Sequence, residues 1–132
     1  MVYGDALEEV MADLVEDNFL NEERFARSYA RGKFRMKHWG RIRIKGELRK
    51  KEISVYCIGK AMEEIEEPDY LQVLKELLLK RYHEKTKIVK RYEKIQDLIN
   101  YGFQRGFETN LVVPMANQIV EETFGASGSL GE

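Results

Sequence analysis

Few residues in this chain of 132 could carry out chemistry. It has two histidines, His38 and His83, and one cysteine, Cys57, and none of them falls within a recognisable metal-binding spacing. The glycine-rich phosphate loops and the serine nucleophile motif of hydrolases are also missing from the sequence. We therefore expect no catalytic residue, no metal site and no cofactor, and the sequence argues against an enzyme. Cys57 lies in the apolar run VYCIG and is expected to be a small buried side chain.

The basic residues are the remaining candidates for function, and they are concentrated in one segment. The formal net charge of the chain is only −1. Residues 24–51, however, contain 12 bases and a single acid, whereas residues 1–23 contain eight acids and no base. Helical surfaces normally mix the two signs, because like charges one turn apart repel each other. The segment therefore indicates a surface for an acidic partner, either phosphate or a carboxylate-rich protein. The alternative is that acids elsewhere in the chain neutralise the segment.

Helical spacing groups these basic side chains further. Arg24, Arg27 and Arg31 follow i, i+3, i+7 and should share one helix face, although Arg24 could instead pair with an acid of residues 16–23. A second row, which should face solvent, follows i, i+4, i+8 at Arg41, Lys45 and Arg49. Trp39 could stack on a base or on a partner side chain, or could simply pack inside the protein. The residues predicted to bind a partner are Arg24, Arg27, Arg31, Lys33, Lys37, Trp39, Arg41, Lys45, Arg49 and Lys50.

The elements that position these residues are predicted to be helices. Apolar residues recur with a period near 3.6, and no segment alternates with a period of 2, so the fold should be all-α. The expected helices cover about residues 5–17, 21 to before 39, 41–51, 55–66, a segment from 70, one through 92–99 and one from about 113. Phe25, Ala26, Tyr29 and Ala30 should form the buried face of the second helix, and Ile44 and Leu48 that of the third. Pro114 should lie in the first turn of the last helix, where proline is tolerated.

The helices also repeat. A shift of 54 residues places Ile44, Lys51, Ile53 and Ile58 upon Leu98, Arg105, Phe107 and Val112, and a shift of 51 relates Ile58 to Leu7. This indicates tandem three-helix repeats that form an elongated, curved helical body. We predict that residues 1–20 are the last helix of a truncated first repeat, 21–67 a second repeat, 68–124 a third and 125–132 a flexible tail.

No stretch of the sequence resembles a membrane span or a signal peptide, and a single cysteine suits a reducing compartment. We therefore expect a cytoplasmic protein that makes no contact with membranes and is a monomer.

Residues 19–54 resemble the RecX family of bacterial recombination regulators. The residues that carry this resemblance are Phe19-Leu20, Glu22-Glu23, Arg24-Phe25-Ala26, Arg27, Arg31, Gly40, Ile44, Glu47-Leu48, Lys51 and Ile53. Arg105-Gly106-Phe107 is similar to the family's Arg-Gly-Phe before its final helix. Glu52 stands where the family usually has glycine, which puts the turn at that position in question.

The resemblance implies three tandem three-helix repeats that bind RecA filaments on single-stranded DNA. The expected function is a non-enzymatic regulator that inhibits homologous recombination and SOS-related activities. It also implies two further helices before Asp5, so the chain would lack most of the first repeat.

Two other interpretations of the residues stay open. A basic helix at 41–51 also suits a DNA-binding module, but it offers no Asn, Gln, Ser or Thr to base edges. Contacts with single- or double-stranded DNA should therefore go to phosphate, without sequence preference. The third interpretation is a helical scaffold whose basic segment is neutralised internally.

Overall fold

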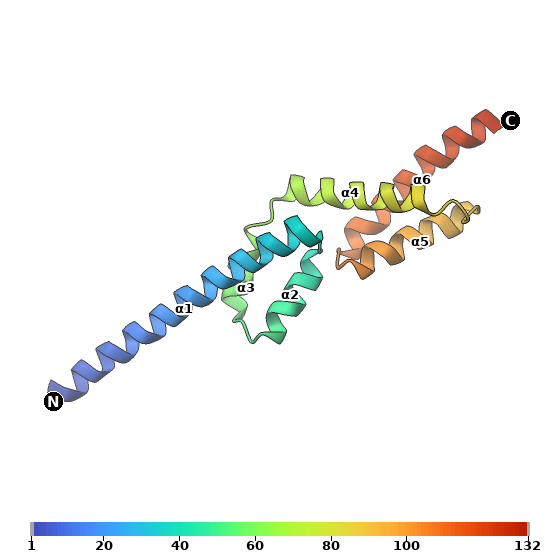
Figure 1. Ribbon diagram of the computed structural model, residues 1–132. Coiled ribbons are helices and arrows are strands. Elements are labelled where there is room, and N and C mark those ends of the chain that lie inside the picture. Colours follow the sequence, from blue (N-terminus) through green and yellow to red (C-terminus); the bar gives the residue numbers. More distant parts are fainter. Residues whose placement is uncertain (1, 132) are drawn as a thin grey trace.

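The computed structural model describes residues 2–131, with side chains for residues 18–123, and contains no strand within that range. The predicted all-α class is confirmed. Its helices, labelled in Figure 1, are α1 (Val2–Lys37), α2 (Arg41–Lys50), α3 (Val55–Met62), α4 (Glu67–Glu84), α5 (Arg91–Gln104) and α6 (Thr109–Gly131).

The helices form two groups of three. The α1 helix packs against α3 and α2, and α5 packs against α6 and α4. Figure 1 shows the two groups one after the other, with the start of α1 and the end of α6 at opposite ends of an elongated molecule. We call them the first unit (α1–α3) and the second unit (α4–α6). The division predicted at residues 20 and 67 stays a prediction, as does the assignment of residues 1–20 to another repeat.

The predicted break between the first two helices is wrong, because α1 continues through residues 17–21. No glycine or proline interrupts this stretch, and Asn21 costs a helix interior only a few tenths of a kcal/mol. The start of α3 is attached just after this stretch. The backbone N–H of Ser54, the N-cap of α3, donates a hydrogen bond to the Glu22 carboxylate. The similarity of Ile58 to Leu7 concerns a side chain outside the described range.

The core of the first unit largely follows the predicted pattern. Ala26, Ala30, Ile44, Leu48 and Cys57 are fully buried. Phe25 is a correction, since 45% of it is exposed. The small side chains Ala26 and Ala30 face the core and leave Phe25 on the outer side of α1, where its ring lies 5.8 Å from that of Tyr29.

Both prolines sit differently from the expectation. The α4 helix begins at Glu67 instead of Tyr70, so Pro68 occupies its first turn, where the missing N–H has no partner to lose. The α6 helix begins at Thr109, and Pro114 lies inside it instead of in the first turn. The carbonyl that Pro114 leaves without a helical partner is that of the exposed Asn110, which water can satisfy. The backbone of α6 stays helical to Gly131, through most of the predicted flexible tail at 125–132.

The same turn ends α2 and α5, which supports the repeat relating Lys51 to Arg105. Glu52 and Gly106 both have positive φ, at 61° and 94°. In each case the next residue donates its N–H to a carbonyl five positions back, Ile53 to Leu48 at 3.1 Å and Phe107 to Gly102 at 3.1 Å. This is the Schellman geometry, which favours glycine at the left-handed position. Glu52 therefore adopts the left-handed position of this turn in spite of its side chain.

Replacing Glu52 by glycine should stabilise the protein. A side chain in the left-handed region costs about 1–2 kcal/mol, and the greater freedom of glycine in the unfolded chain offsets part of that gain. We expect Glu52→Gly to raise the free energy of unfolding by about 0.5–1 kcal/mol in urea denaturation. The control Glu76→Gly, in the middle of α4, should lower it by about 1 kcal/mol. A Glu52→Gly protein no more stable than the parent would contradict the strain at this turn.

The two units meet where two backbones touch. The Gly40 N–H donates to the Arg105 carbonyl at 2.8 Å, and the Ile42 N–H donates to the Gly106 carbonyl at 3.0 Å. The Arg41 N–H donates to the Tyr70 hydroxyl at 2.9 Å. Gly40 is the N-cap of α2 and has no side chain to cap it. The second unit thus satisfies the N–H groups of Arg41 and Ile42, which have no acceptor within α2.

The motif Arg105-Gly106-Phe107 forms the second unit's side of this junction. The Arg105 guanidinium donates to the Lys37 carbonyl at the end of α1 and so caps that helix. Phe107 is fully buried and stacks on Tyr70, with ring centroids 4.9 Å apart. Arg105 and Gly106 therefore contact the first unit, whereas Phe107 packs within the second unit against Tyr70.

Gly40→Ala should disrupt the junction. A Cβ at position 40 would lie 2.2 Å from the carbonyl carbon and oxygen of Gly106, with only backbone to displace. We expect a loss of roughly 1–3 kcal/mol in unfolding free energy, as for overpacked sites in general. The matched control is Gly46→Ala in α2, where a Cβ would meet nothing within 4 Å. This substitution should raise the free energy of unfolding by about 0.5–1 kcal/mol. Equal effects of the two substitutions would show that the close approach does not limit position 40.

Candidate partner-binding surface

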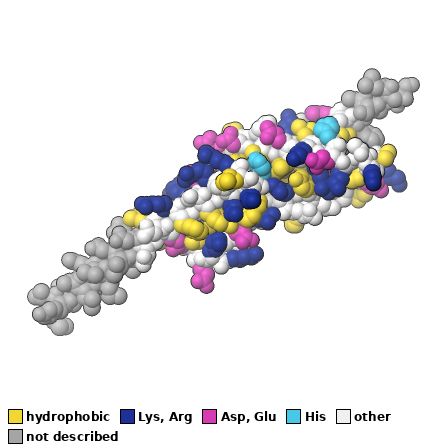
Figure 2. All heavy atoms as spheres, viewed as in Figure 1, with side chains coloured by type: hydrophobic (Ala, Val, Ile, Leu, Met, Phe, Trp, Pro, Cys, Tyr) yellow, Lys and Arg dark blue, Asp and Glu magenta, His cyan; other side chains and the backbone are white. Residues whose placement is uncertain are grey.

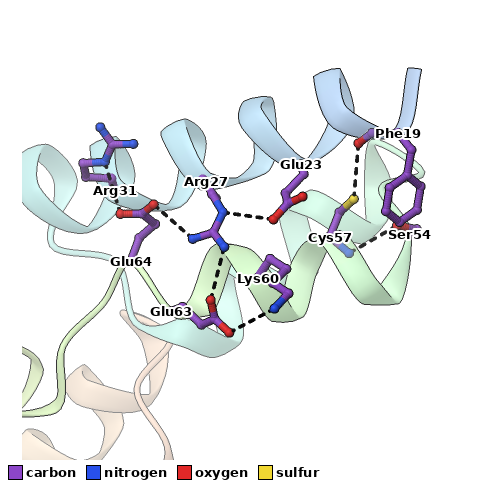
Figure 3. Close-up of polar contacts among 9 residues, drawn as sticks. All are labelled: Phe19, Glu23, Arg27, Arg31, Ser54, Cys57, Lys60, Glu63 and Glu64. Carbon is purple, nitrogen blue, oxygen red and sulfur yellow. Dashed lines mark hydrogen bonds and ion pairs between the residues drawn. The ribbon is translucent and has the colours of Figure 1, made fainter. Parts of the chain in front are cut away.

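Ion pairs within the first unit engage part of the predicted arginine row. Figure 3 shows Arg27 between Glu23 on its own helix and two acids just after α3. Its guanidinium nitrogens lie 3.2 Å from Glu23, 3.1 Å from Glu63 and 3.2 Å from Glu64. Arg31 lies 3.6 Å from Glu64. The Arg27 hydrogen bond, with the nearby Lys60, lowers the pKa of Glu63.

Arg24, Arg27 and Arg31 were expected to share one helix face. Arg27 and Arg31 turn towards α3, while Arg24 is exposed. The three arginines do not lie on one free face, and the neutralised-segment interpretation describes Arg27 best.

Arg41 is a second correction, because it was expected to face solvent. Only 18% of its side chain is exposed, and it lies in the junction between the units. Its guanidinium pairs with Glu67 and with Glu108, at 2.9 Å from the latter, and lies 3.9 Å from the centre of the Tyr70 ring. The first turn of α2 points towards the second unit, so Arg41 stabilises the junction.

Hydrogen bonds set the ionisation of this junction. Burial and the hydrogen bond to Glu108 raise the pKa of Tyr70, so its hydroxyl stays protonated and donates to the Glu108 carboxylate. Burial alone would raise the pKa of Glu108, but hydrogen bonds from Tyr70 and Arg41 outweigh it and leave that pKa below its ordinary value.

A different set of cations gathers around aromatic rings between α1 and α2. The Arg43 guanidinium lies 4.1 Å and the Lys33 ammonium 4.9 Å from the centre of the Trp39 ring. Tyr29 has Lys33 at 5.5 Å and Lys51 at 5.6 Å. Such distances allow cation–π attraction. We call Tyr29, Lys33, Met36, Trp39, Arg43 and Lys51 the α1–α2 surface.

The α1–α2 surface also has an apolar part. A depression of about 250 Å³ is lined by residues that include Tyr29, Gly32, Lys33 and Met36. Met36 is 80% exposed at its edge. Figure 2 shows basic and hydrophobic side chains interleaved on the face in view. This mixture is typical of protein-binding surfaces, where Arg, Met and aromatic residues are enriched.

The other predicted residues lie outside this cluster. Arg49 is exposed and Lys45 half-buried, and with the exposed Ile42 they line the outer flank of α2. Lys37, exposed at the end of α1, is the exception, because it lines the depression of the α1–α2 surface. Lys50 is exposed and lies 3.2 Å from Glu47.

Four residues of the α1–α2 surface, Tyr29, Met36, Arg43 and Lys51, were missed as candidates. Tyr29 was expected in the core, and Arg43 and Lys51 did not fit the row that contained Arg41. The available signal was their position two residues after Arg41 and after Arg49, which places them on a different side of α2. Trp39 is partly buried and packs against the core, so packing explains most of its environment.

The chemistry available here is recognition. Among the residues whose side chains are described, no group of three or more His, Cys, Asp or Glu could hold a metal ion. In the same part of the chain, no helix is long and apolar enough to cross a membrane.

The junction should weaken in acid. Because the pKa of Glu108 is lowered on folding, its contribution to stability is present above its unfolded pKa of about 4.3 and is lost as the pH falls through the folded value. We expect Glu108→Gln to cost about 1 kcal/mol at neutral pH, since its site is partly exposed. Urea denaturation at neutral pH and in acid should show that the difference in unfolding free energy from the parent protein becomes smaller in acid. Glu76→Gln should match the parent at both pH values, and a Glu108→Gln gap independent of pH would contradict this ionisation.

Comparisons with known proteins agree with this architecture. Residues 21–62, from the middle of α1 to the end of α3, match the family model described as RecX, second three-helix domain. The chain is 29% identical over 103 residues to the regulatory protein RecX of Streptococcus sanguinis (strain SK36), covering 77% of this chain and 40% of that protein. It is 31% identical over 104 residues to the regulatory protein RecX of Lactococcus lactis subsp. cremoris (strain SK11), covering 75% of this chain and 39% of that protein. No solved structure gives a significant match. The chain thus spans about two fifths of the length of these relatives, and its first unit from residue 21 is similar to the second three-helix domain of the RecX family.

Proposed function

We propose that this chain binds RecA filaments through its α1–α2 surface and thereby inhibits homologous recombination and SOS-related activities. The observation that carries the proposal is that some basic side chains pair with acids of the same chain and others do not. Arg27 and Arg41 are engaged by internal acids, whereas Lys33, Arg43 and Lys51 lie over aromatic rings beside the exposed Met36.

A folded, acidic protein surface suits this arrangement better than phosphate alone. Met36 and the apolar depression add contacts that neither need charge nor weaken with salt. The cations around them supply electrostatic steering and orientation towards an acidic partner. Exposed Phe25, on the outer side of α1, extends the apolar area next to Tyr29.

The shape of the molecule supports a filament as the partner. Two three-helix units joined end to end offer one elongated body, which can follow a groove over several subunits. Inhibition would then follow from occupying the filament surface, and no turnover is required.

Contact between α2 and DNA would be limited to phosphates. The exposed Arg49 on the outer flank of α2 could reach a phosphate, but α2 offers no base-reading amide or hydroxyl side chain. A module that binds only DNA is the competing function, and the experiment below separates the two.

Reversing two charges of the α1–α2 surface should impair filament binding. We expect Arg43→Glu/Lys51→Glu to weaken binding about tenfold or more to RecA filaments assembled on single-stranded DNA with a non-hydrolysable ATP analogue. Surface substitutions usually cost about 0.5 kcal/mol or less, so the helical circular dichroism spectrum should be unchanged. Arg27 and Arg41 are left intact, since reversing either would leave internal acids unpaired.

The matched control carries the same charge change on α4. Lys75→Glu/Lys80→Glu should bind filaments like the parent protein, since both lysines lie outside the α1–α2 surface. Salt titration gives a second readout. Six phosphate contacts on a single strand would give a slope near −4 in log affinity against log salt, and filament binding should fall less steeply than binding to bare DNA. Equal slopes and equal affinities for the two targets would favour the DNA-binding module.

A further inference from the structure

The turn between α4 and α5 carries a second basic cluster that the proposed function does not use. Residues 85–94 contain five bases, Lys85, Lys87, Lys90, Arg91 and Lys94, against the single acid Glu93. In Figure 2 basic and hydrophobic side chains lie together at the end of the molecule where Figure 1 has this turn. The α1–α2 surface belongs to the other unit, so the two clusters are separate.

Three of these lysines have no acidic partner within the described part of the chain. Lys85, Lys87 and Lys90 are exposed and form no salt bridge with any residue of 18–123. The arginines nearby behave differently, since Arg81 pairs with Asp97 at 2.9 Å and Arg91 pairs with Glu121. The fold therefore neutralises the arginines and leaves the lysines of the turn available.

Exposed apolar side chains accompany these lysines. Tyr92 is 73% exposed and Val89 is 71% exposed, although Tyr92 begins a stripe of apolar residues at helical spacing in the helix predicted through residues 92–99. Only Ile95, Leu98 and Ile99 of that stripe pack against or within the core. The Tyr92 ring is therefore presented to solvent among cations, where burial does not explain it.

We infer that this turn binds single-stranded nucleic acid, with the lysines of the turn contacting phosphates and the ring of Tyr92 stacking on a base. Cationic side chains with an interleaved exposed aromatic ring are the components of single-strand binding sites. A duplex keeps its bases stacked on each other and offers no base face to Tyr92. A protein partner fits less well, because Val89 and Tyr92 form a small apolar area compared with the core of a protein interface. Phosphate and ring contacts carry no sequence information, so binding should show no sequence preference.

The experiment needs no filament protein, so its outcome is independent of the proposed function. The probe is a fluorescently labelled oligothymidylate, and fluorescence anisotropy measures its affinity for the whole chain. Tyr92→Ala should bind at least about fivefold more weakly, as expected for the loss of one stacked base, while Tyr92→Phe should keep the parent affinity. Lys87→Ala/Lys90→Ala should also weaken binding and make the salt slope shallower by about 1.4, the value for two phosphate contacts on a single strand.

The control removes two positive charges from α4 instead of from the turn. Lys80 pairs with Glu84 in its own helix, and Lys75→Ala/Lys80→Ala should leave oligothymidylate affinity and salt slope at the parent values. A labelled duplex should bind more weakly than the single strand to the parent protein. Equal losses in the two lysine pairs, or a Tyr92→Ala protein with parent affinity, would overturn the site. Parent-like oligothymidylate binding by the turn variants combined with lost filament binding would also overturn it, and would assign the turn to a protein partner.

Discussion

The arrangement of the molecule depends on how the first turn of α2 is capped. A helix begins with backbone N–H groups that have no partner inside the helix, and a side chain at the N-cap usually accepts one of them. Gly40 has no such side chain, and the acceptors for Arg41 and Ile42 are the Tyr70 hydroxyl and the Gly106 carbonyl of the second unit. Separating the units would break these hydrogen bonds and leave the N–H groups to water, so each bond contributes about 0.5–1.5 kcal/mol net to the junction. The glycine that prevents α2 from capping itself is also the one that lets the two backbones touch.

This junction decides which cations remain for a partner. Arg41 lies one residue after Gly40, and the approach of the second unit brings Glu67 and Glu108 to it. Two positions further along α2, Arg43 turns away from these acids and lies over Trp39. The same helix therefore contributes one arginine to stability and another to the α1–α2 surface. Arg41 and Arg43 carry the same charge, so their different roles follow from their different positions in the first turn of α2.

Hydropathy period predicted the helical class and much of the core, including Ile44, Leu48 and Cys57, because burial of one helix face is a local pattern. It failed between residues 17 and 21, since an Asn followed by two acids is equally compatible with a helix start and with a helix interior. The candidate surface was less accessible to prediction. Besides the nearby Glu23, the acids that engage Arg27 lie 36 and 37 residues away, and those that engage Arg41 lie 26 and 67 residues away. Spacing along one helix cannot reveal such partners, so the sequence identified the basic segment but could not sort its members.

The repeated turn shows how one backbone geometry serves two purposes. The α2 helix ends in Lys51-Glu52-Ile53 and α5 in Arg105-Gly106-Phe107. Both turns have the same hydrogen bonds, and in both the middle residue has positive φ. In the second unit the turn faces the other unit, and its middle residue must be glycine because a Cβ would lie 2.4 Å from that of Arg43. In the first unit Glu52 is exposed, so only the strain of the left-handed conformation opposes a side chain there. That strain is small enough for stability to tolerate, which explains why Glu52 can stand where the family usually has glycine while Gly106 cannot be replaced in the same way.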